Sequence, residues 1–143
     1  MRDKIFVDTN ILVYSRDASE KLKQPIAKKC LEKLWLEQTG VISTQVLNEY
    51  YVTVTEKIKP GMSQIDAWED VCALMAWSPL SIDMAILHQT KIIEEKYSIS
   101  WWDAMIVAAA KIGGCKAIYS EDLSNGHIIL GVKIVNPFLD YKN

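Results

Sequence analysis

The sequence predicts a single α/β domain in which a parallel sheet of short strands is flanked by helices. Short apolar runs alternate with longer segments of helical periodicity, which is the pattern of a parallel sheet covered on both faces. A length of 143 residues fits one domain, and 50% hydrophobic against 24% charged residues allows a real core. No internal repeat, low-complexity stretch or linker divides the chain, so we expect residues 1–143 to form one domain.

The N-terminal elements follow from one apolar run and one proline. Residues 4–7, a lysine followed by three apolar residues, predict a buried strand. Residues 8–14 begin with side chains that can cap a helix, and they predict a short helix. Residues 15–23 are polar and predict a loop. Pro25 fits the first turn of a second helix, which carries apolar residues on one face to about residue 38.

The middle of the chain is predicted to form a second strand and two more helices. Residues 41–43 form the strand, and Ser43 or Thr44 caps a helix that runs until the Pro60-Gly61 pair breaks it. Ser63 begins the next helix, whose apolar stripe extends to Met75.

The last elements are predicted from shorter patterns. Residues 79–82 are a candidate for a third strand, and Asp83 caps a helix through residue 97. Residues 101–112 are apolar nearly all round, which indicates a central, buried helix. Two short apolar runs, residues 117–119 and 132–135, complete a sheet of about five strands.

Four acids occur where predicted elements begin or end: Asp8, Glu49, Asp103 and Asp122. Asp8 and Asp122 follow strands, whereas Glu49 and Asp103 are expected in the first turns of helices that start on the same side. Ligands of open parallel sheets collect at the carboxyl ends of the strands. We therefore expect all four carboxylates at one edge of the sheet.

Converging carboxylates repel one another unless a cation holds them together. A site with oxygen ligands alone suits Mg²⁺ or Mn²⁺, and phosphodiester cleavage is a common reaction of such sites. Each acid also has an ordinary structural role open to it. Asp8 is a possible helix cap, Glu49 a surface acid, Asp103 the partner of Ser100 in a capping box and Asp122 a turn residue.

Residues beside the four acids are further candidates. Thr9, Asn10 and Ser120 can orient the carboxylates or simply cap and turn the chain. Glu121 is either solvent-facing or an extra metal ligand. His127 follows a glycine near Asp122, where contact with a substrate is one alternative to a structural role.

The composition gives no overall attraction for nucleic acid. The net charge is −2 and the pI is about 5.7, so binding of RNA would require a local basic patch or a bound metal to offset the acids. Trp101 and Trp102 are expected in the core and at its edge, with stacking on an RNA base as the less favoured alternative.

The cysteines and the N-terminus favour a reducing compartment. Cys30, Cys72 and Cys115 are odd in number and have no CxxC spacing, so we expect buried, reduced thiols. The N-terminus does not resemble a signal peptide, and no apolar stretch is long enough to span a bilayer. We expect a cytoplasmic protein that does not bind membranes.

With the four acids in place, the chain resembles the PIN-domain ribonucleases, and among them the VapC-type toxins of bacterial toxin–antitoxin pairs. The resemblance covers nearly the whole chain and is weakest over residues 57–80. Besides the ending at residues 126–138, the matching segments are Phe6-Val7-Asp8-Thr9-Asn10-Ile11-Leu12, Ser43-Thr44-Gln45-Val46-Leu47-Asn48-Glu49, Ser100-Trp101-Trp102-Asp103-Ala104-Met105-Ile106-Val107-Ala108-Ala109-Ala110 and Ile118-Tyr119-Ser120-Glu121-Asp122-Leu123.

The resemblance implies a PIN-like (Rossmann-like) domain with a parallel sheet of about five strands. It also implies a Mg²⁺ or Mn²⁺ site formed by Asp8, Glu49, Asp103 and Asp122, at which a metal-activated water hydrolyses RNA phosphodiester bonds. Proteins of this kind are usually homodimers that a cognate antitoxin holds inactive. The RNA target and the number of metal ions stay open.

Two other functions are compatible with an α/β domain of this size. A phosphatase of the haloacid dehalogenase type also begins with a strand and Asp8, but it needs a second acid where this chain has Asn10. A catalytically silent PIN-like scaffold would only bind a partner, and the four intact acids argue against it. A dinucleotide-binding domain would need a Gly-x-Gly-x-x-Gly loop, which the sequence lacks.

Overall fold

The centre of the computed structural model, which describes residues 2–139, is a five-stranded sheet with the order β2-β1-β3-β5-β4. Strands β2, β1, β3 and β5 run parallel, and β4 pairs antiparallel with β5 at one edge. The predicted α/β fold is therefore confirmed, with one antiparallel edge strand added. The strands are β1 (Ile5–Val7), β2 (Gly40–Val41), β3 (Ala117–Tyr119), β4 (Ile128–Ile129) and β5 (Val132–Val135).

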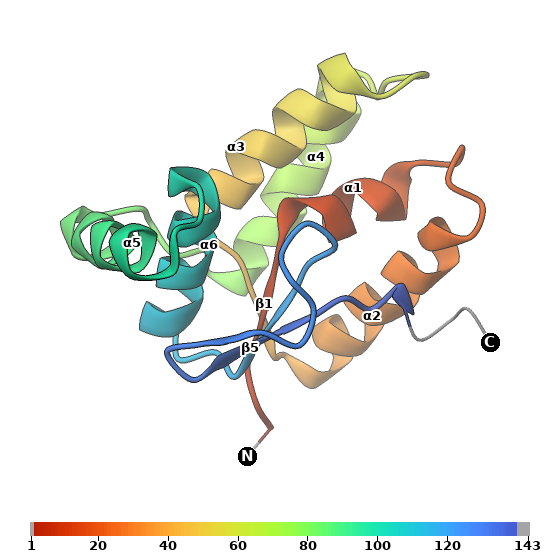
Figure 1. Cartoon of the computed structure of the whole chain (residues 1–143). Coiled ribbons are helices and arrows are strands. Elements are labelled where there is room, and N and C mark those ends of the chain that lie inside the picture. The colour runs from red at the N-terminus through yellow and green to blue at the C-terminus, as the bar shows by residue number, and fades with distance from the viewer. Residues whose placement is uncertain (1, 140–143) are drawn as a thin grey trace.

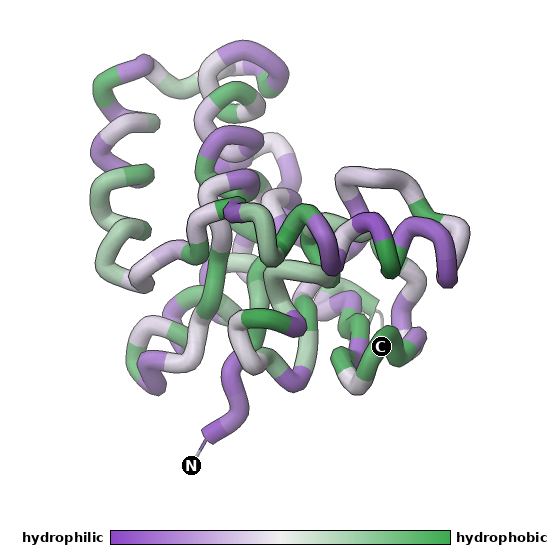
Figure 2. Tube along the Cα trace, turned by 90° about the vertical axis from the view of Figure 1, so that its left-hand side faces the viewer, coloured by the Kyte–Doolittle hydropathy of each residue, from purple (hydrophilic) through white to green (hydrophobic). Residues whose placement is uncertain are grey.

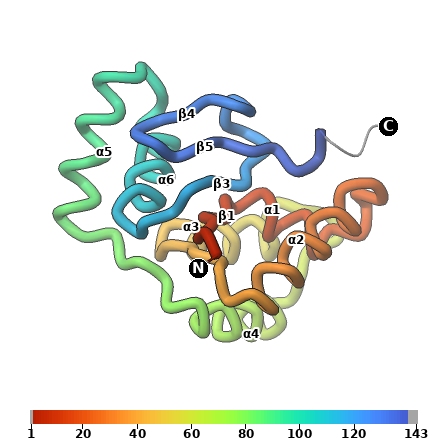
Figure 3. Tube along the Cα trace, turned by 90° about the horizontal axis from the view of Figure 1, so that it is seen from below, coloured from red at the N-terminus to blue at the C-terminus, as the bar shows by residue number. Residues whose placement is uncertain are grey.

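Helices cover both faces of this sheet (Figures 1 and 3). Helix α6 packs on β3 and β5 and is itself covered by α5, whereas α1 and α2 pack together on the opposite side. Helices α3 and α4 contact each other, and α3 also contacts α1. The helices are α1 (Thr9–Arg16), α2 (Lys23–Glu37), α3 (Thr44–Val52), α4 (Gln64–Leu74), α5 (Met84–Tyr97) and α6 (Trp101–Ile112), with short helical turns η1 (Thr53–Lys57) after α3 and η2 (Met75–Trp77) after α4.

The core lies where the sequence predicts it. Hydrophobic residues concentrate in the centre of the molecule, and hydrophilic residues lie along the outer helices and the N-terminal approach to β1 (Figure 2). Helix α6 is buried without interruption from Ala104 to Ala110, as expected for a central helix. The Gly40 position needs the absence of a side chain, because a Cβ there would lie 2.4 Å from the ring of Trp77.

The capping residues also begin their helices as predicted. The side chains of Ser43, Ser63, Asp83 and Ser100 each accept a hydrogen bond from the backbone N–H three residues later. Ser43 rather than Thr44 is the cap of α3. These caps fix where α3 and α6 start, and hence where Glu49 and Asp103 lie.

Two strand predictions differ from the structure. Residues 79–82 form no strand, because Pro79 has no N–H to donate and only Leu80 pairs, in a single parallel bridge with Ser43. The fifth strand is instead β4, which the sequence does not indicate. It is joined to β5 by Leu130 and Gly131, both at positive φ, as a type I′ hairpin turn requires.

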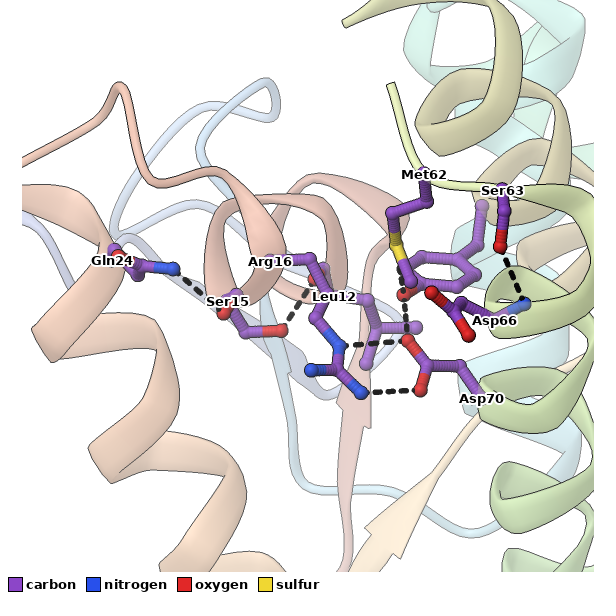
Figure 4. A network of polar contacts seen from close by, with 9 residues as sticks. Leu12, Ser15, Arg16, Gln24, Met62, Ser63, Asp66 and Asp70 are labelled. Atoms are coloured by element: carbon purple, nitrogen blue, oxygen red, sulfur yellow. Dashed lines mark hydrogen bonds and ion pairs between the residues drawn. The ribbon is translucent and has the colours of Figure 1, made fainter. Parts of the chain in front are cut away.

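An ion pair ties α1 to α4 (Figure 4). The guanidinium of Arg16 donates to both carboxylate oxygens of Asp70, from Nε at 2.8 Å and from Nη2 at 2.5 Å. Asp70 also accepts a hydrogen bond from the hydroxyl of Tyr50, which is buried on α3. The carboxylate of Asp70 on α4 therefore joins α4 to both α1 and α3.

The expectations about the chain's environment are met only in part. The three cysteines are free, but Cys72 is exposed and Cys30 is half-buried, so only Cys115 is the buried thiol that the sequence predicts. Burial raises the pKa of Cys115 to about 12, which keeps it as an unreactive thiol. Across residues 2–139, we find no helix with the length and apolar character that a membrane span would need.

Candidate active site

Asp8 is the buried centre of the acid site. It follows β1 directly, caps the N-terminus of α1 and is only 6% exposed. The N–H of Thr9 donates to its Oδ1 at 2.7 Å, and the hydroxyl of Ser120 donates to its Oδ2 at 2.7 Å. Since Ser120 follows β3, the neighbour of β1 in the sheet, the parallel pairing of these strands places this carboxylate.

Burial is the main influence on the charge of Asp8. The pKa of this carboxyl is raised from 3.8 to about 6, mainly by burial and to a smaller extent by the nearby charges of Asp122 and Glu49. The hydrogen bonds from Ser120 and Thr9 act in the opposite direction. At neutral pH the group is therefore ionised at a cost in stability, which a cation at this position would relieve.

Asn10 joins Asp8 to Asp122 through its side-chain amide. Its Nδ2 donates to Asp8 Oδ2 at 3.4 Å and to Asp122 Oδ2 at 3.2 Å. Its Oδ1 accepts the backbone N–H of Glu121 at 3.1 Å, which fixes the loop after β3. Asp122 is exposed, so this pair of carboxylates extends from the core to the surface.

Glu49 enters the same network from α3. The hydroxyl of Thr9 donates to its Oε2 at 3.1 Å, and Nε2 of Gln45 donates to its Oε1 at 2.8 Å. Glu49 lies in the second turn of α3, whereas the sequence analysis expected the first. Gln45 is a further residue of the site, and its spacing of four from Glu49, which puts both side chains on one helix face, is the signal in the sequence that points to it.

Asp103 is the least connected of the four acids. It lies half-buried in the first turn of α6, where its backbone N–H donates to Ser100 as in a capping box. Its tie to the other acids is indirect, since Gln45 Nε2 donates both to Glu49 and, at 3.3 Å, to the carbonyl oxygen of Trp102. The network thus joins Asp8, Glu49 and Asp122 and reaches the residue before Asp103.

The carboxylates are held by these donors and do not close around a common point. Within residues 2–139, no three side chains of His, Cys, Asp or Glu are close enough together to form a ligand shell as they stand. Thr9 and Asn10 occupy the spaces between the acids. Thr9, Asn10 and Ser120 are thus hydrogen-bond donors to these carboxylates.

Glu121 and His127, the two remaining candidates, contact residues outside the network of the four acids. The carboxylate of Glu121 accepts a hydrogen bond from Tyr14 Oη at 2.5 Å and pairs with Lys23 Nζ at 2.5 Å, so both of its oxygens are engaged. The exposed ring of His127 packs edge-on against Tyr97, with 6.1 Å between ring centroids. Neither geometry favours a role in holding a metal.

A groove between α3 and α6 opens beside the acids. It encloses about 780 Å³, with Glu49 and Gln45 on the α3 side and Trp102 and Met105 on the α6 side. Trp102 is 62% exposed, so the expectation that it lies at the edge of the core is wrong. An apolar wall therefore lies directly next to the carboxylates.

Ser120 supports both the fold and the acids, which gives a testable prediction. Besides donating to Asp8, its buried hydroxyl accepts the N–H groups of Asp122 and Leu123 at 3.2 and 3.3 Å. Ser120→Ala is expected to lower the free energy of unfolding by about 2–3 kcal/mol at pH 7, because it leaves a buried carboxylate and two N–H groups without this partner. Urea unfolding measures the change.

The control for this prediction is Ser124→Ala, an exposed serine of the same loop, which is expected to change stability by less than about 0.5 kcal/mol. The cost of Ser120→Ala should also shrink at pH 4–5, where Asp8 is protonated in the folded chain. An equal cost at both pH values would show that the hydroxyl does not serve the ionised carboxylate.

Comparisons with known proteins agree with this fold and place the chain in a family. A model of the PIN domain matches residues 5–124. The structure is similar to VapC20 of Mycobacterium tuberculosis, a sarcin–ricin loop cleaving toxin, with a TM-score of 0.64 and 20% identity over 83% of this chain and 90% of that one. It is also similar to a chain of a toxin–antitoxin complex from Klebsiella pneumoniae, with a TM-score of 0.63 and 21% identity over 94% and 98% of the two chains.

The match to the PIN-domain model assigns the chain to a family, and the solved structures support its fold. No match was found among curated proteins. At 20% and 21% identity, the solved structures establish a shared fold and no more. Because the PIN-domain model spans most of the sequence, including Asp8, Glu49, Asp103 and Asp122, the chain belongs to the PIN-domain family.

Proposed function

We propose that this PIN-domain protein is a metal-dependent endoribonuclease and the toxin of a toxin–antitoxin pair. The observation that carries the proposal is the network in which Thr9, Asn10 and Ser120 orient Asp8, Glu49 and Asp122 at the carboxyl edge of the sheet. The two similar structures support it, since one is described as a sarcin–ricin loop cleaving toxin and the other comes from a toxin–antitoxin complex.

The residues present suit Mg²⁺ or Mn²⁺ by their chemistry. The donors are carboxylate oxygens, and Asp8 is a buried acid whose ionised form a cation would stabilise. Mg²⁺ commonly keeps several waters and takes only one or two protein carboxylates, so a closed shell of three acids is not required. In this proposal Asp8, Asp103 and Asp122 hold the ion directly, and Glu49 binds through water or at a second metal site.

When bound, such an ion lowers the pKa of a water and neutralises charge on a phosphodiester. The protein's own contribution is orientation. Ser120 and Thr9 fix Asp8, and Asn10 keeps Asp122 beside it. Glu49 is held by Thr9 and Gln45 at the mouth of the groove, where it can accept a proton from a water.

The proposal includes partners that follow from the same resemblance. RNA is the substrate, a cognate antitoxin protein covers the acids, the active form is a homodimer, and the protein acts in the cytoplasm. A basic side chain from the antitoxin would relieve the repulsion between Asp8, Glu49 and Asp122, which gives inhibition a physical reason.

Cleavage of total RNA by the purified chain with Mg²⁺ or Mn²⁺ tests the proposal. Asp103→Asn keeps the shape of the side chain and the backbone bond to Ser100 but removes the charge. It is expected to lower the cleavage rate by at least about a hundredfold, because the site loses a metal ligand. The fold should survive, which circular dichroism checks.

The matched control is Asp66→Asn, which removes an exposed acid of α4 away from the network and should leave the rate unchanged. EDTA should abolish cleavage by the wild type. Equal cleavage by Asp103→Asn and wild type would reject the assignment. Hydrolysis of p-nitrophenyl phosphate would indicate a phosphatase instead, and absence of Mg²⁺ binding by calorimetry would indicate a silent scaffold.

A further inference from the structure

The groove beside the acids has the size and position of a binding site. Its volume of about 780 Å³ lies in the range of small-ligand pockets. Glu49 belongs both to its wall and to the acid network, so whatever occupies the groove lies against the reacting edge of the site. The lining residues are mainly from α3 and α6, together with Ile82, Thr53 and Lys57.

An aromatic side chain is exposed on this wall. Trp102 is 62% exposed although it belongs to α6, the helix whose residues 104–110 are all buried. An indole presented to solvent beside a polar site provides a stacking surface for a planar, unpaired base. Lys57 also lines this groove and brings a positive charge to it.

A second, independent feature is a hydrogen-bond acceptor without a donor. Gln45 is only 7% exposed and lines the groove, and its Oε1 has no hydrogen-bond partner among the described residues. The orientation of the amide is fixed, because Nε2 donates to Glu49 Oε1 and to the carbonyl of Trp102. If the nitrogen and oxygen of this amide were exchanged, the oxygen would face Glu49 Oε1 and the carbonyl oxygen of Trp102, which are both acceptors. The group missing at Oε1 is therefore a hydrogen-bond donor.

We infer that this groove binds one unpaired nucleobase of an RNA substrate, stacked on Trp102, with an N–H group of the base directed to Gln45. A base supplies both things that the groove lacks, a flat ring for the indole and an N–H donor for Oε1. The inference rests on the proposed function and extends it to substrate recognition. Since Glu49 lines the same groove, the phosphate next to this base would lie beside the acids.

Binding of short single-stranded RNA in EDTA tests the inference separately from cleavage. Trp102→Leu keeps an apolar side chain but removes the stacking surface, whereas Trp102→Phe keeps an aromatic ring. Stacking of one base typically changes affinity by about five- to a hundredfold. We expect Trp102→Leu to weaken binding by about tenfold and Trp102→Phe by less than about threefold.

The matched control is Trp68→Leu, which changes a 54% exposed tryptophan of α4 that does not line the groove and should leave RNA binding unaltered. Unchanged binding by Trp102→Leu, or no detectable RNA binding by the wild type, would overturn the inference. So would sedimentation showing that Trp102→Leu dissociates a wild-type dimer, because the groove would then be a contact between two copies of this chain.

Failure of the inference and failure of the proposed function give different results. If the wild type cleaves RNA and Trp102→Leu binds RNA normally, the nuclease assignment holds and the base site does not. If binding depends on Trp102 but no RNA is cleaved with Mg²⁺ or Mn²⁺, the base site holds and the nuclease assignment does not.

Discussion

Asp8→Asn is expected to abolish RNA cleavage and at the same time to stabilise the metal-free protein. Loss of this carboxylate should lower the cleavage rate by on the order of a hundred- to a thousandfold, because it removes a charge at the centre of the site. The free energy of unfolding should rise, because the ionised group is buried and its pKa is raised from 3.8 to about 6.

The pH dependence of this gain has a definite sign. The folded chain keeps the Asp8 proton up to about pH 6, whereas the unfolded chain releases it near pH 3.8. The charge of Asp8 therefore costs nothing below pH 3.8, costs more as the pH rises through this window, and reaches about 3 kcal/mol above pH 6. Because an asparagine satisfies the donors Ser120 and Thr9 less well, we expect a net gain of about 1–2 kcal/mol at pH 7.

Urea unfolding in EDTA at pH 4 and pH 7, together with the cleavage assay, measures both effects. Asp122→Asn is the control, because it removes a carboxylate of the same network that is exposed. It should lose cleavage without a comparable gain in stability. A metal-free Asp8→Asn protein that is less stable than the wild type at pH 7 would show that the buried charge is not penalised.

Asp70→Ala is expected to cost about 2–3 kcal/mol of stability without affecting the acids. Asp70 holds Arg16 of α1 and the hydroxyl of Tyr50 of α3, and Tyr50 is only 2% exposed. Burial and the bond to Asp70 both raise the pKa of Tyr50, so the hydroxyl stays a donor. Most of the cost comes from this buried donor, because the half-exposed Arg16 can return to water.

Asp66→Ala on the same helix is the control, since Asp66 is exposed and should contribute less than about 0.5 kcal/mol (Figure 4). Tyr50→Phe should be nearly neutral in the Asp70→Ala background, because the hydroxyl has already lost its partner. If the two substitutions are additive, or if Asp70→Ala costs no more than Asp66→Ala, the contact between α3 and α4 does not depend on this carboxylate.

Most of the helices and strands were predictable because they depend on residues that are close together in the sequence. The buried runs at β1 and β3, the caps at Ser63 and Asp83 and the apolar helix α6 are all set by neighbouring residues. The failures have local causes as well. Pro79 prevents a strand at residues 79–82, and the turn before β5 uses Leu130, which is not a usual residue at positive φ.

The sequence indicated which acids to consider, but not the hydrogen bonds that connect them. Strand ends predicted that Asp8 and Asp122 would meet, and the amide of Asn10 joins them. The role of Gln45 depends on α6 passing close enough for the Trp102 carbonyl to accept its N–H, which no local pattern indicates. The exposure of Trp102 likewise depends on which side of α6 the sheet and α5 cover.

By itself, the sequence determined most of the elements, the parallel arrangement of the four strands β1, β2, β3 and β5, and the four acids as candidates, since these follow from periodicity, capping and the ends of strands. Only the tertiary structure decided the burial of Asp8, with its raised pKa, and the hydrogen-bond network that joins Asp8, Glu49 and Asp122. It also decided the groove that Trp102 and Gln45 share. Burial and electrostatic contact arise between elements distant in the chain, so they appear only when the helices and the sheet have packed.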